Sequence, residues 1–259
     1  AGGTVVHINA AMAGLVGAYV IGKRIGYGKE AMTPHSLTLT MVGASLLWVG
    51  WFGFNAGSAL GANGLAAVAF INTFSATCAS VAGWLLVERL RDGHATSLGA
   101  ASGIVAGLVA ITPACAYVDT FGALFIGLIA GAVTAAAVGL KYKFGYDDSL
   151  DVVGVHLVGG LVGTVLIGFF GTTSVNEFSA NGLFYGGGFT QLIRQIEAAL
   201  IVLVFSFVVT YLIGLILTKT LGFRVSKDEE LEGVDIALQA ETAYDLVDSS
   251  KGSSKGVSA

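Results

Sequence analysis

Long apolar runs separated by short polar stretches make up most of this chain. The runs are residues 4–22, 37–60, 65–87, 97–114, 121–140, 152–170 and 192–218. Most of them approach the roughly 20 apolar residues that an α-helix needs to cross the hydrocarbon core of a bilayer. The pattern therefore predicts an all-α fold, a polytopic membrane helix bundle with seven transmembrane helices.

Lysine and arginine between the runs predict the orientation of these helices. The polar stretches that carry them are 23–36, 88–96, 141–151 and the residues after 218. The stretches that lack both are 61–64, 115–120 and 171–189. Only Arg194 breaks this alternation. By the positive-inside rule, the charged stretches and the C-terminus are cytoplasmic, in a plasma or inner cell membrane, and the first helix runs from outside to inside.

Composition supports a membrane protein and limits the classes of partner that we expect for it. Only 12% of the residues are charged, against about 25% in soluble domains. The net charge of −4 arises in the stretch after residue 225, and the charges of the preceding residues are nearly balanced. We therefore expect the lipid bilayer as a partner and no nucleic acid. We predict a membrane domain over 1–222, a cytoplasmic regulatory tail over 223–248 with a short helix, and a disordered C-terminus over 249–259.

The chain lacks the motifs of enzymes and of metal sites. Neither HExxH, nor a P-loop, nor GxSxG, nor GxGxxG at the start of a βαβ unit is present. The cysteines, Cys78 and Cys115, are isolated, which is not the spacing of a metal site or a disulfide framework. We therefore expect no catalytic residue, no metal and no cofactor.

Two histidines lie inside apolar runs, His7 in the first and His156 in the sixth. An ionisable side chain in hydrocarbon is costly unless it faces a protein interior or a pore. Each is followed by Gly-Leu-Val-Gly, at 14–17 and 160–163, which favours close helix packing. The pair predicts one shared site, with a ring-to-ring hydrogen bond as one arrangement. The alternative is two separate interior histidines, each bonded to a backbone carbonyl, and their unequal distances from the segment ends do not establish a contact.

The second run contains an aromatic and hydroxyl face near its outer end. Trp51, Phe54 and Ser58 are spaced i, i+3 and i+7, so they share one side of a helix. Aromatic faces attract cations, and a hydroxyl can accept a hydrogen bond from an ammonium-type donor. The alternative is an interfacial aromatic belt, which is common in membrane proteins.

Glycines spaced four apart predict a compact bundle, because they let neighbouring backbones approach closely. The pairs are Gly53/Gly57, Gly57/Gly61, Gly99/Gly103, Gly103/Gly107, Gly127/Gly131 and Gly159/Gly163.

Several strings of the chain, in their order, closely resemble the ammonium transporter family (Amt/MEP/Rh). They are AGGTVVHINAAMAGLVGAYVIGKRIGYGKE, GWFGFNAGSA, TPACAYV, DVVGVHLVGGLVGT and EGVD…AETAY. The resemblance implies a fold of eleven membrane helices, ten of which form two inverted five-helix repeats. This chain resembles helices five to eleven, so helices one to four are expected upstream of Ala1, and the isolated chain is not expected to transport.

The resemblance also implies roles for single residues. His7 and His156 match the paired pore histidines, and Phe54 matches one of two phenylalanines that gate the pore. Trp51 matches a pore-lining tryptophan, and Ser58 matches the hydroxyl of the outer ammonium recruitment site. The other gate phenylalanine, the recruitment-site tryptophan and an acidic residue are expected upstream of Ala1.

The implied function is nitrogen uptake by transmembrane transport of ammonium, ammonia or methylammonium, in a homotrimer. The tail resembles the region on which PII-type signalling proteins dock, although Gln239 and Ala240 stand where many members have His-Gly. Two alternatives stay open. One is an ammonium sensor that signals through the tail, and the other is a membrane enzyme with His7 and His156 as metal ligands, which needs a third ligand.

Overall fold

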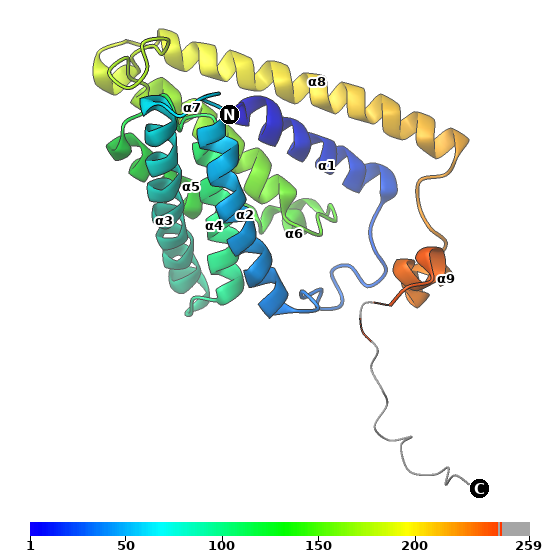
Figure 1. The fold of residues 1–259 in the computed structure, drawn as a ribbon. Coiled ribbons are helices and arrows are strands. Elements are labelled where there is room, and N and C mark those ends of the chain that lie inside the picture. The colour runs from blue at the N-terminus through cyan, green and yellow to red at the C-terminus, as the bar shows by residue number, and fades with distance from the viewer. Residues whose placement is uncertain (243, 245–259) are drawn as a thin grey trace, which may run out of the picture. The chain divides into compact units, whose positions relative to one another are not determined.

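The structure, a computed structural model, describes residues 1–242 and 244 and consists there of helices joined by loops (Figure 1). In chain order they are η1 (Thr4–Ile8), α1 (Asn9–Ile21), α2 (Leu37–Gly57), α3 (Gly64–Asp92), α4 (Ser97–Ile111), α5 (Thr120–Ala137), α6 (Leu140–Phe144), η2 (Val153–Leu157), α7 (Val158–Phe170), η3 (Leu183–Tyr185), α8 (Thr190–Thr220), α9 (Lys227–Glu232) and η4 (Asp235–Gln239). The segments η1, η2 and η4 are π-helical, and η3 is a 3₁₀ turn.

Side-chain caps fix the starts of four long helices. Ser36, Asn63, Thr96 and Asp119 each accept a hydrogen bond from a backbone N–H of the first turn of α2, α3, α4 and α5. Such caps satisfy donors that have no partner inside the helix, and each contributes about 1 kcal/mol. The loops therefore end at defined residues, and the apolar runs begin there.

The predicted fold class is confirmed within the described residues, and one of the seven expected helices is short. Six helical segments are long and apolar enough to cross a membrane. These are Thr4–Ile21, Leu37–Gly57, Gly64–Asp92, Thr120–Phe144, Val153–Phe170 and Thr190–Thr220. The seventh, α4, has 15 residues, so at ~1.5 Å per residue it spans about 22 Å of a hydrocarbon core of about 30 Å. Turns at 112–117 extend it at its C-terminal end.

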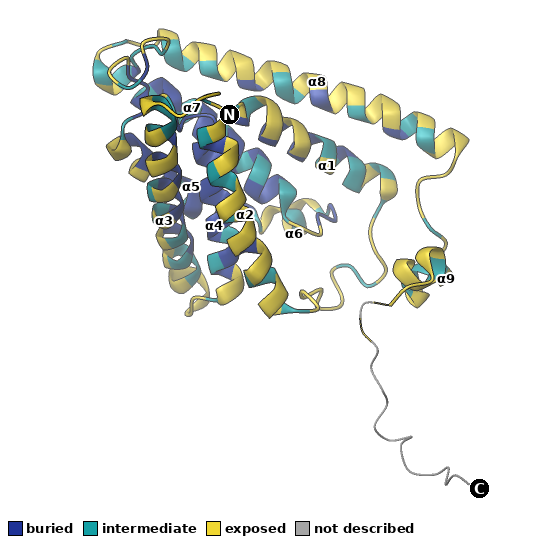
Figure 2. Cartoon of the chain, in the orientation of Figure 1, coloured by how far each residue is buried: buried dark blue, intermediate teal, exposed yellow. Residues whose placement is uncertain are grey.

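The most closely packed part of the bundle is built from α3, α4, α5 and α7. Three glycines there leave no room for a side chain. A Cβ at Gly127 or Gly131 of α5 would overlap the carbonyl of Ala76 or Ser80 of α3, and one at Gly163 of α7 would overlap that of Ala110 of α4. Figure 2 shows the contrast between the dark blue, buried stretches of α4, α5 and α7 and the long yellow, exposed stretches of α2 and α8. The predicted close packing of the glycine pairs is confirmed for this half of the chain.

Two glycine predictions were wrong. Gly53 and Gly57 of α2 have nothing within 4 Å of a built Cβ, so the pairs that include Gly57 are not contact sites among the described residues. In the first Gly-Leu-Val-Gly string, Gly17 is equally open and Gly14 makes only an ordinary contact with Val152, whereas Gly160 of the second lies against Ile8 and His7. The reason is location, because α7 lies in the interior while α1 and α2 each leave a face uncovered.

The residues after 222 form a separate unit, Phe223–Ala259. Ser226 and Glu229 form a capping box that starts α9, and Arg224 pairs with Glu230 at 2.7 Å. Gly233, with φ of 106°, ends this helix. The short tail helix is therefore present, broken between α9 and η4. The predicted disorder of 249–259 lies outside the described residues.

We expect Gly131→Ala to destabilise the bundle, because its methyl group would collide with the backbone of α3. Overpacking of this kind costs about 1–3 kcal/mol. Thermal unfolding of the purified protein in detergent, followed by circular dichroism, measures it. Gly53→Ala is the matched control and should not lower the midpoint, because its methyl group meets no neighbour and alanine favours the helix. Equal midpoints for both variants would contradict the close approach of α3 and α5.

Candidate functional site

The structure brings His7 and His156 together although 148 residues separate them. Their ring centroids lie 5.5 Å apart with an angle of 61° between the planes. Each is the fourth of five residues in a π-helical turn, η1 for His7 and η2 for His156. Such turns are rare and frequently occur at functional sites. The contact decides in favour of one shared location over two separate interior histidines.

Both imidazoles present buried polar atoms without a partner. His7 is 4% exposed. Among the residues that the structure describes, His7 Nε2 and His156 Nδ1 are buried and have no hydrogen-bond partner. In place of the ring-to-ring hydrogen bond considered above, the rings meet edge to face. Because an unpaired buried polar group costs about 1–3 kcal/mol, these atoms suit a small hydrogen-bonding ligand or water.

An aromatic row leads from the predicted outer end of α2 to the histidine pair. The Trp51 ring stacks on His7 with centroids 5.3 Å apart and planes 22° apart. Phe54 meets Trp51 edge to face at 5.8 Å. The three residues line a pocket of about 630 Å³ whose other walls are apolar residues of η1 and α2. Helical spacing predicts that Trp51 and Phe54 share a face, but nothing in the sequence indicates that this face reaches His7.

Ser58 lies one turn beyond Phe54, at the exposed C-terminal end of α2. Its hydroxyl donates to the Phe54 carbonyl at 2.7 Å. With the proton engaged, the oxygen keeps its lone pairs for an external donor. The structure therefore leaves Ser58 able to accept a hydrogen bond at the end of the aromatic row.

Two polar contacts at the site escape the sequence patterns. Trp51 Nε1 donates to Thr112 Oγ1 at 2.8 Å, and Asn55 Nδ2 donates to Thr73 Oγ1 at 3.0 Å. Both contacts join α2 to the rest of the bundle. Thr112 belongs to the TPACAYV string, but its partner lies 61 residues away, and no local spacing connects them.

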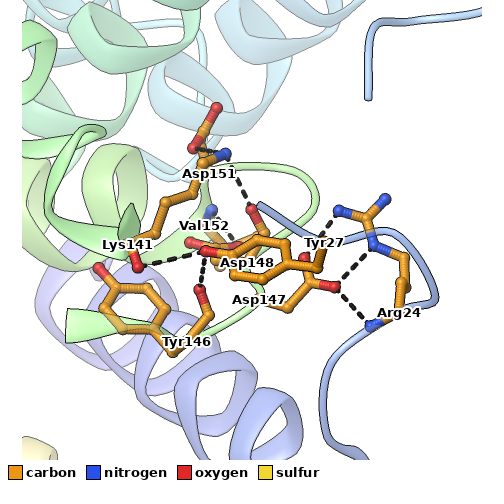
Figure 3. Close-up of polar contacts among 8 residues, drawn as sticks. All are labelled: Arg24, Tyr27, Lys141, Tyr146, Asp147, Asp148, Asp151 and Val152. Carbon is orange, nitrogen blue, oxygen red and sulfur yellow. Dashed lines mark hydrogen bonds and ion pairs between the residues drawn. The ribbon is translucent and has the colours of Figure 1, made fainter. Parts of the chain in front are cut away.

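A charged network holds the loop that precedes η2 (Figure 3). Asp148 accepts hydrogen bonds from the backbone N–H groups of Val152 and Val153, at 3.0 and 2.7 Å, and so caps the start of the segment that carries His156. Lys141 pairs with Asp151 at 2.7 Å. The first turns of η2 are therefore fixed by carboxylates outside the apolar run.

Arg24, which follows α1, binds the same loop. Its guanidinium contacts both carboxylate oxygens of Asp147, at 2.9 and 2.7 Å, and its backbone N–H donates to one of them. The Asp147 side chain is 2% exposed. Burial by itself would raise the pKa of Asp147, but the hydrogen bonds and charge of Arg24 outweigh it and lower that pKa. Tyr27 adds a hydrogen bond to the Tyr146 carbonyl at 2.7 Å, so the loops of the two histidine-bearing segments are joined.

The comparison with protein families decides the identity of the fold. The model of the Ammonium Transporter Family matches residues 1–244. The chain belongs to the ammonium transporter family. The predicted resemblance is thereby confirmed.

Curated relatives and solved structures agree with this. The chain is 55% identical over 251 residues to an ammonium transporter of Mycobacterium bovis, covering 95% of the chain and 53% of the relative. It is 49% identical to an ammonium transporter of Bacillus subtilis, covering 94% and 60%. The crystal structure of Saccharomyces cerevisiae Mep2 matches with a TM-score of 0.82 and 34% identity, over 88% of this chain and 53% of that one. The chain spans about half the length of the relatives it matches.

These relatives are named as transporters, so the family is one of transport proteins and not of enzymes. The histidine–metal alternative also lacks a third ligand in the described part of the chain, where no group of three His, Cys, Asp or Glu side chains is placed to hold a metal ion.

We expect Asp147→Asn to lower the free energy of unfolding at pH 7, by about 1–3 kcal/mol, because Arg24 loses its charged acceptor. The pKa of Asp147 is lowered in the folded state, so its stabilisation is present above the unfolded pKa of about 4 and is lost as the pH falls through the folded value. Thermal unfolding across this pH range measures the difference between variant and natural protein.

The matched control is Asp92→Asn, whose pair with Arg91 is about 40–48% exposed and contributes little. A difference for Asp147→Asn that persists at pH values well below its folded pKa would contradict the ion pair as its cause.

Proposed function

We propose that the protein transports ammonium or ammonia across the cell membrane through a path that passes Phe54, Trp51 and the histidine pair. One observation carries the proposal. Two histidines from distant segments meet in an apolar interior, with unpaired ring nitrogens, at the end of an aromatic row. This arrangement provides recruitment of a cation at one end and hydrogen bonding of a small neutral molecule at the other.

The outer end suits an ammonium ion. A bare cation that enters an apolar pocket loses its hydration at large cost. The π faces of Trp51 and Phe54, and the free lone pairs of Ser58, replace part of that hydration. The hydroxyl accepts one N–H of the ion, and the rings attract the remaining charge. Ser58 is therefore the proposed recruitment residue, and Phe54 the proposed gate.

The inner end suits ammonia. Crossing is easier if the proton leaves and the neutral molecule continues. An imidazole nitrogen can accept a hydrogen bond from ammonia or donate one to it, and can also relay the proton. His7 and His156 bring two such rings within 5.5 Å of each other, each with one unpaired nitrogen. The proposed roles are therefore pore-lining bases, with Trp51 forming the wall on the recruitment side.

The remaining proposals concern placement and partners. The asymmetry of lysine and arginine supports a plasma or inner membrane location with a cytoplasmic C-terminus. The resemblance to the family implies a homotrimer and methylammonium as an alternative substrate, and we propose both for this protein. The tail string EGVD…AETAY resembles the region on which PII-type signalling proteins dock, and on that resemblance we propose such a partner, with Gln239 and Ala240 as the departure from the family pattern.

A second candidate function is ammonium sensing through the tail. A structure named as a sensor Amt protein matches with a TM-score of 0.82 and 30% identity, over 92% of this chain and 59% of that one. Ammonium flux distinguishes the two functions, because a sensor without transport would bind ammonium and leave the flux near background.

We expect the double variant His7→Ala/His156→Ala of the natural protein to abolish uptake of labelled methylammonium or to change its selectivity. The variant removes the polar atoms that replace hydration in the apolar interior. Uptake into cells, normalised to the amount of protein in the membrane, measures the effect. His94→Ala, in an exposed loop, is the control. Unchanged rate and selectivity in a well-expressed double variant would contradict the assigned role.

We expect Ser58→Ala to raise the concentration of half-maximal uptake by roughly 2- to 12-fold, the equivalent of one hydrogen bond. The matched control is Ser45→Ala, because Ser45 makes the same bond to the carbonyl four residues earlier but lies on the opposite half of α2. An equal effect of both substitutions would show a helix effect and not recruitment.

The gate is tested separately with Phe54→Ala. We expect it to open the path and raise leakage of other cations, because a ring that fills the entrance is removed. Leakage of potassium from proteoliposomes measures it. Potassium leakage equal to that of the natural protein would exclude a gating role.

A further inference from the structure

The only polar atom of the Trp51 side chain is bonded away from the pocket that its ring lines. Trp51 Nε1 donates to Thr112 Oγ1 at 2.8 Å. Thr112 is fully buried and lies outside the lining of that pocket. Its own hydroxyl proton goes to the Leu108 carbonyl at 2.7 Å. Because that proton is engaged, the oxygen can only accept from the indole, and the direction of the bond is fixed.

The helix that carries Trp51 is held by a small set of contacts. Only Ala44 and Asn55 of α2 are buried, and Phe52 and Trp48 stack on rings of α3. These ring contacts are made by other side chains of α2, so they do not set the tilt of the Trp51 indole itself. The Trp51–Thr112 bond ties α2 to the end of α4, and the Asn55–Thr73 bond ties it to α3. In both, a buried threonine donates back into its own helix and accepts from α2.

The position of the indole determines two contacts at once. Its face stacks on His7, and its ring meets Phe54 edge to face. If the N–H bond is lost, the ring is free to tilt, and both contacts change. The freed donor would also need a partner, because a buried N–H without one costs about 1–3 kcal/mol. The partner available to the freed Trp51 N–H is water that enters the pocket.

We propose that Thr112 is a positioning residue that keeps the indole N–H out of the path, so that the wall between Phe54 and His7 offers only π and apolar surface. The inference rests on the proposed transport function. A dry wall admits a molecule that can shed its hydration and proton, and it excludes cations that must stay hydrated. Thr112 therefore sets selectivity for ammonium over potassium without touching the substrate.

The experiment compares Thr112→Val, which loses the acceptor at nearly constant volume, with Thr112→Ser, which keeps it. The natural protein in liposomes is assayed for ammonium and potassium flux. Ultraviolet resonance Raman spectra report the strength of the indole hydrogen bond. We expect Thr112→Val to weaken the indole bond and to lower the ammonium-to-potassium ratio by roughly 2- to 12-fold, the equivalent of one hydrogen bond. Thr112→Ser should match the natural protein.

The matched control is Thr77→Val. Thr77 is equally buried and donates to a carbonyl of its own helix, but it holds no indole. Thr77→Val should leave the indole Raman band and the ammonium-to-potassium flux ratio unchanged. If Thr112→Val and Thr77→Val lower the ratio equally, the effect is structural and the proposal is wrong.

A double-mutant cycle with Trp51→Phe keeps the test decisive if Thr112→Val alone folds poorly. With donor and acceptor both removed, no polar group is left unpaired, so we expect the double variant to fold better than Thr112→Val and to match Trp51→Phe in its ratio. Strictly additive effects would overturn the proposal, as would an unshifted indole band in Thr112→Val. Absence of ammonium flux in the natural protein would refute the proposed function. The indole Raman band would still test the Trp51–Thr112 hydrogen bond in that case.

Discussion

An imidazole inside a membrane protein needs a hydrogen-bonding partner, and the two that this chain brings together do not supply one to each other. His7 and His156 meet edge to face with one buried nitrogen of each unpaired, and this arrangement is the constraint on which the other features depend. Gly160 gives His7 and Ile8 room to lie close to α7. Gly163 and Gly127 then seat α7 and α5 against the backbones of α4 and α3. The packing of glycines thus determines where the two rings can meet.

Different kinds of interaction hold the two sides of the histidine pair in place. On the side of α2, aromatic stacking and two hydrogen bonds to buried threonines set the position of Trp51, because the helix itself buries little surface. On the other side, charged groups act at the ends of the histidine-bearing segments. Asp148 caps η2, and Arg24 joins the loop after α1 to Asp147. Strong electrostatic contacts are thus kept outside the apolar spans, where their desolvation costs least.

Sequence patterns predict the helices well and the contacts less well. Seven apolar runs correspond to seven helical segments, since hydrophobic length is a strong signal in membrane proteins. Trp51 and Phe54 fall on one face because helical spacing is local. The meeting of His7 and His156 does not follow from the sequence, where their distances from the ends of their apolar runs are unequal. The π-helical turns under both histidines have no simple sequence signal.

The failures have a common physical origin. Gly53 and Gly17 have the same spacing as Gly131 and Gly163, but only tertiary position decides whether a neighbouring backbone is present. Local patterns do not identify Thr112, because a buried threonine that bonds its own helix resembles a packing residue until its partner is known. Local patterns report which faces are apolar, while the pairing of faces depends on the whole bundle.

The most direct test of the proposed function is a flux measurement on the purified natural protein in proteoliposomes. An inward ammonium gradient is applied, and the internal pH or the current is followed, with a potassium gradient of equal size as the reference. Transport predicts a signal that depends on ammonium, saturates with its concentration and is absent for potassium and for protein-free vesicles. A folded protein that gives no signal above protein-free vesicles would contradict it.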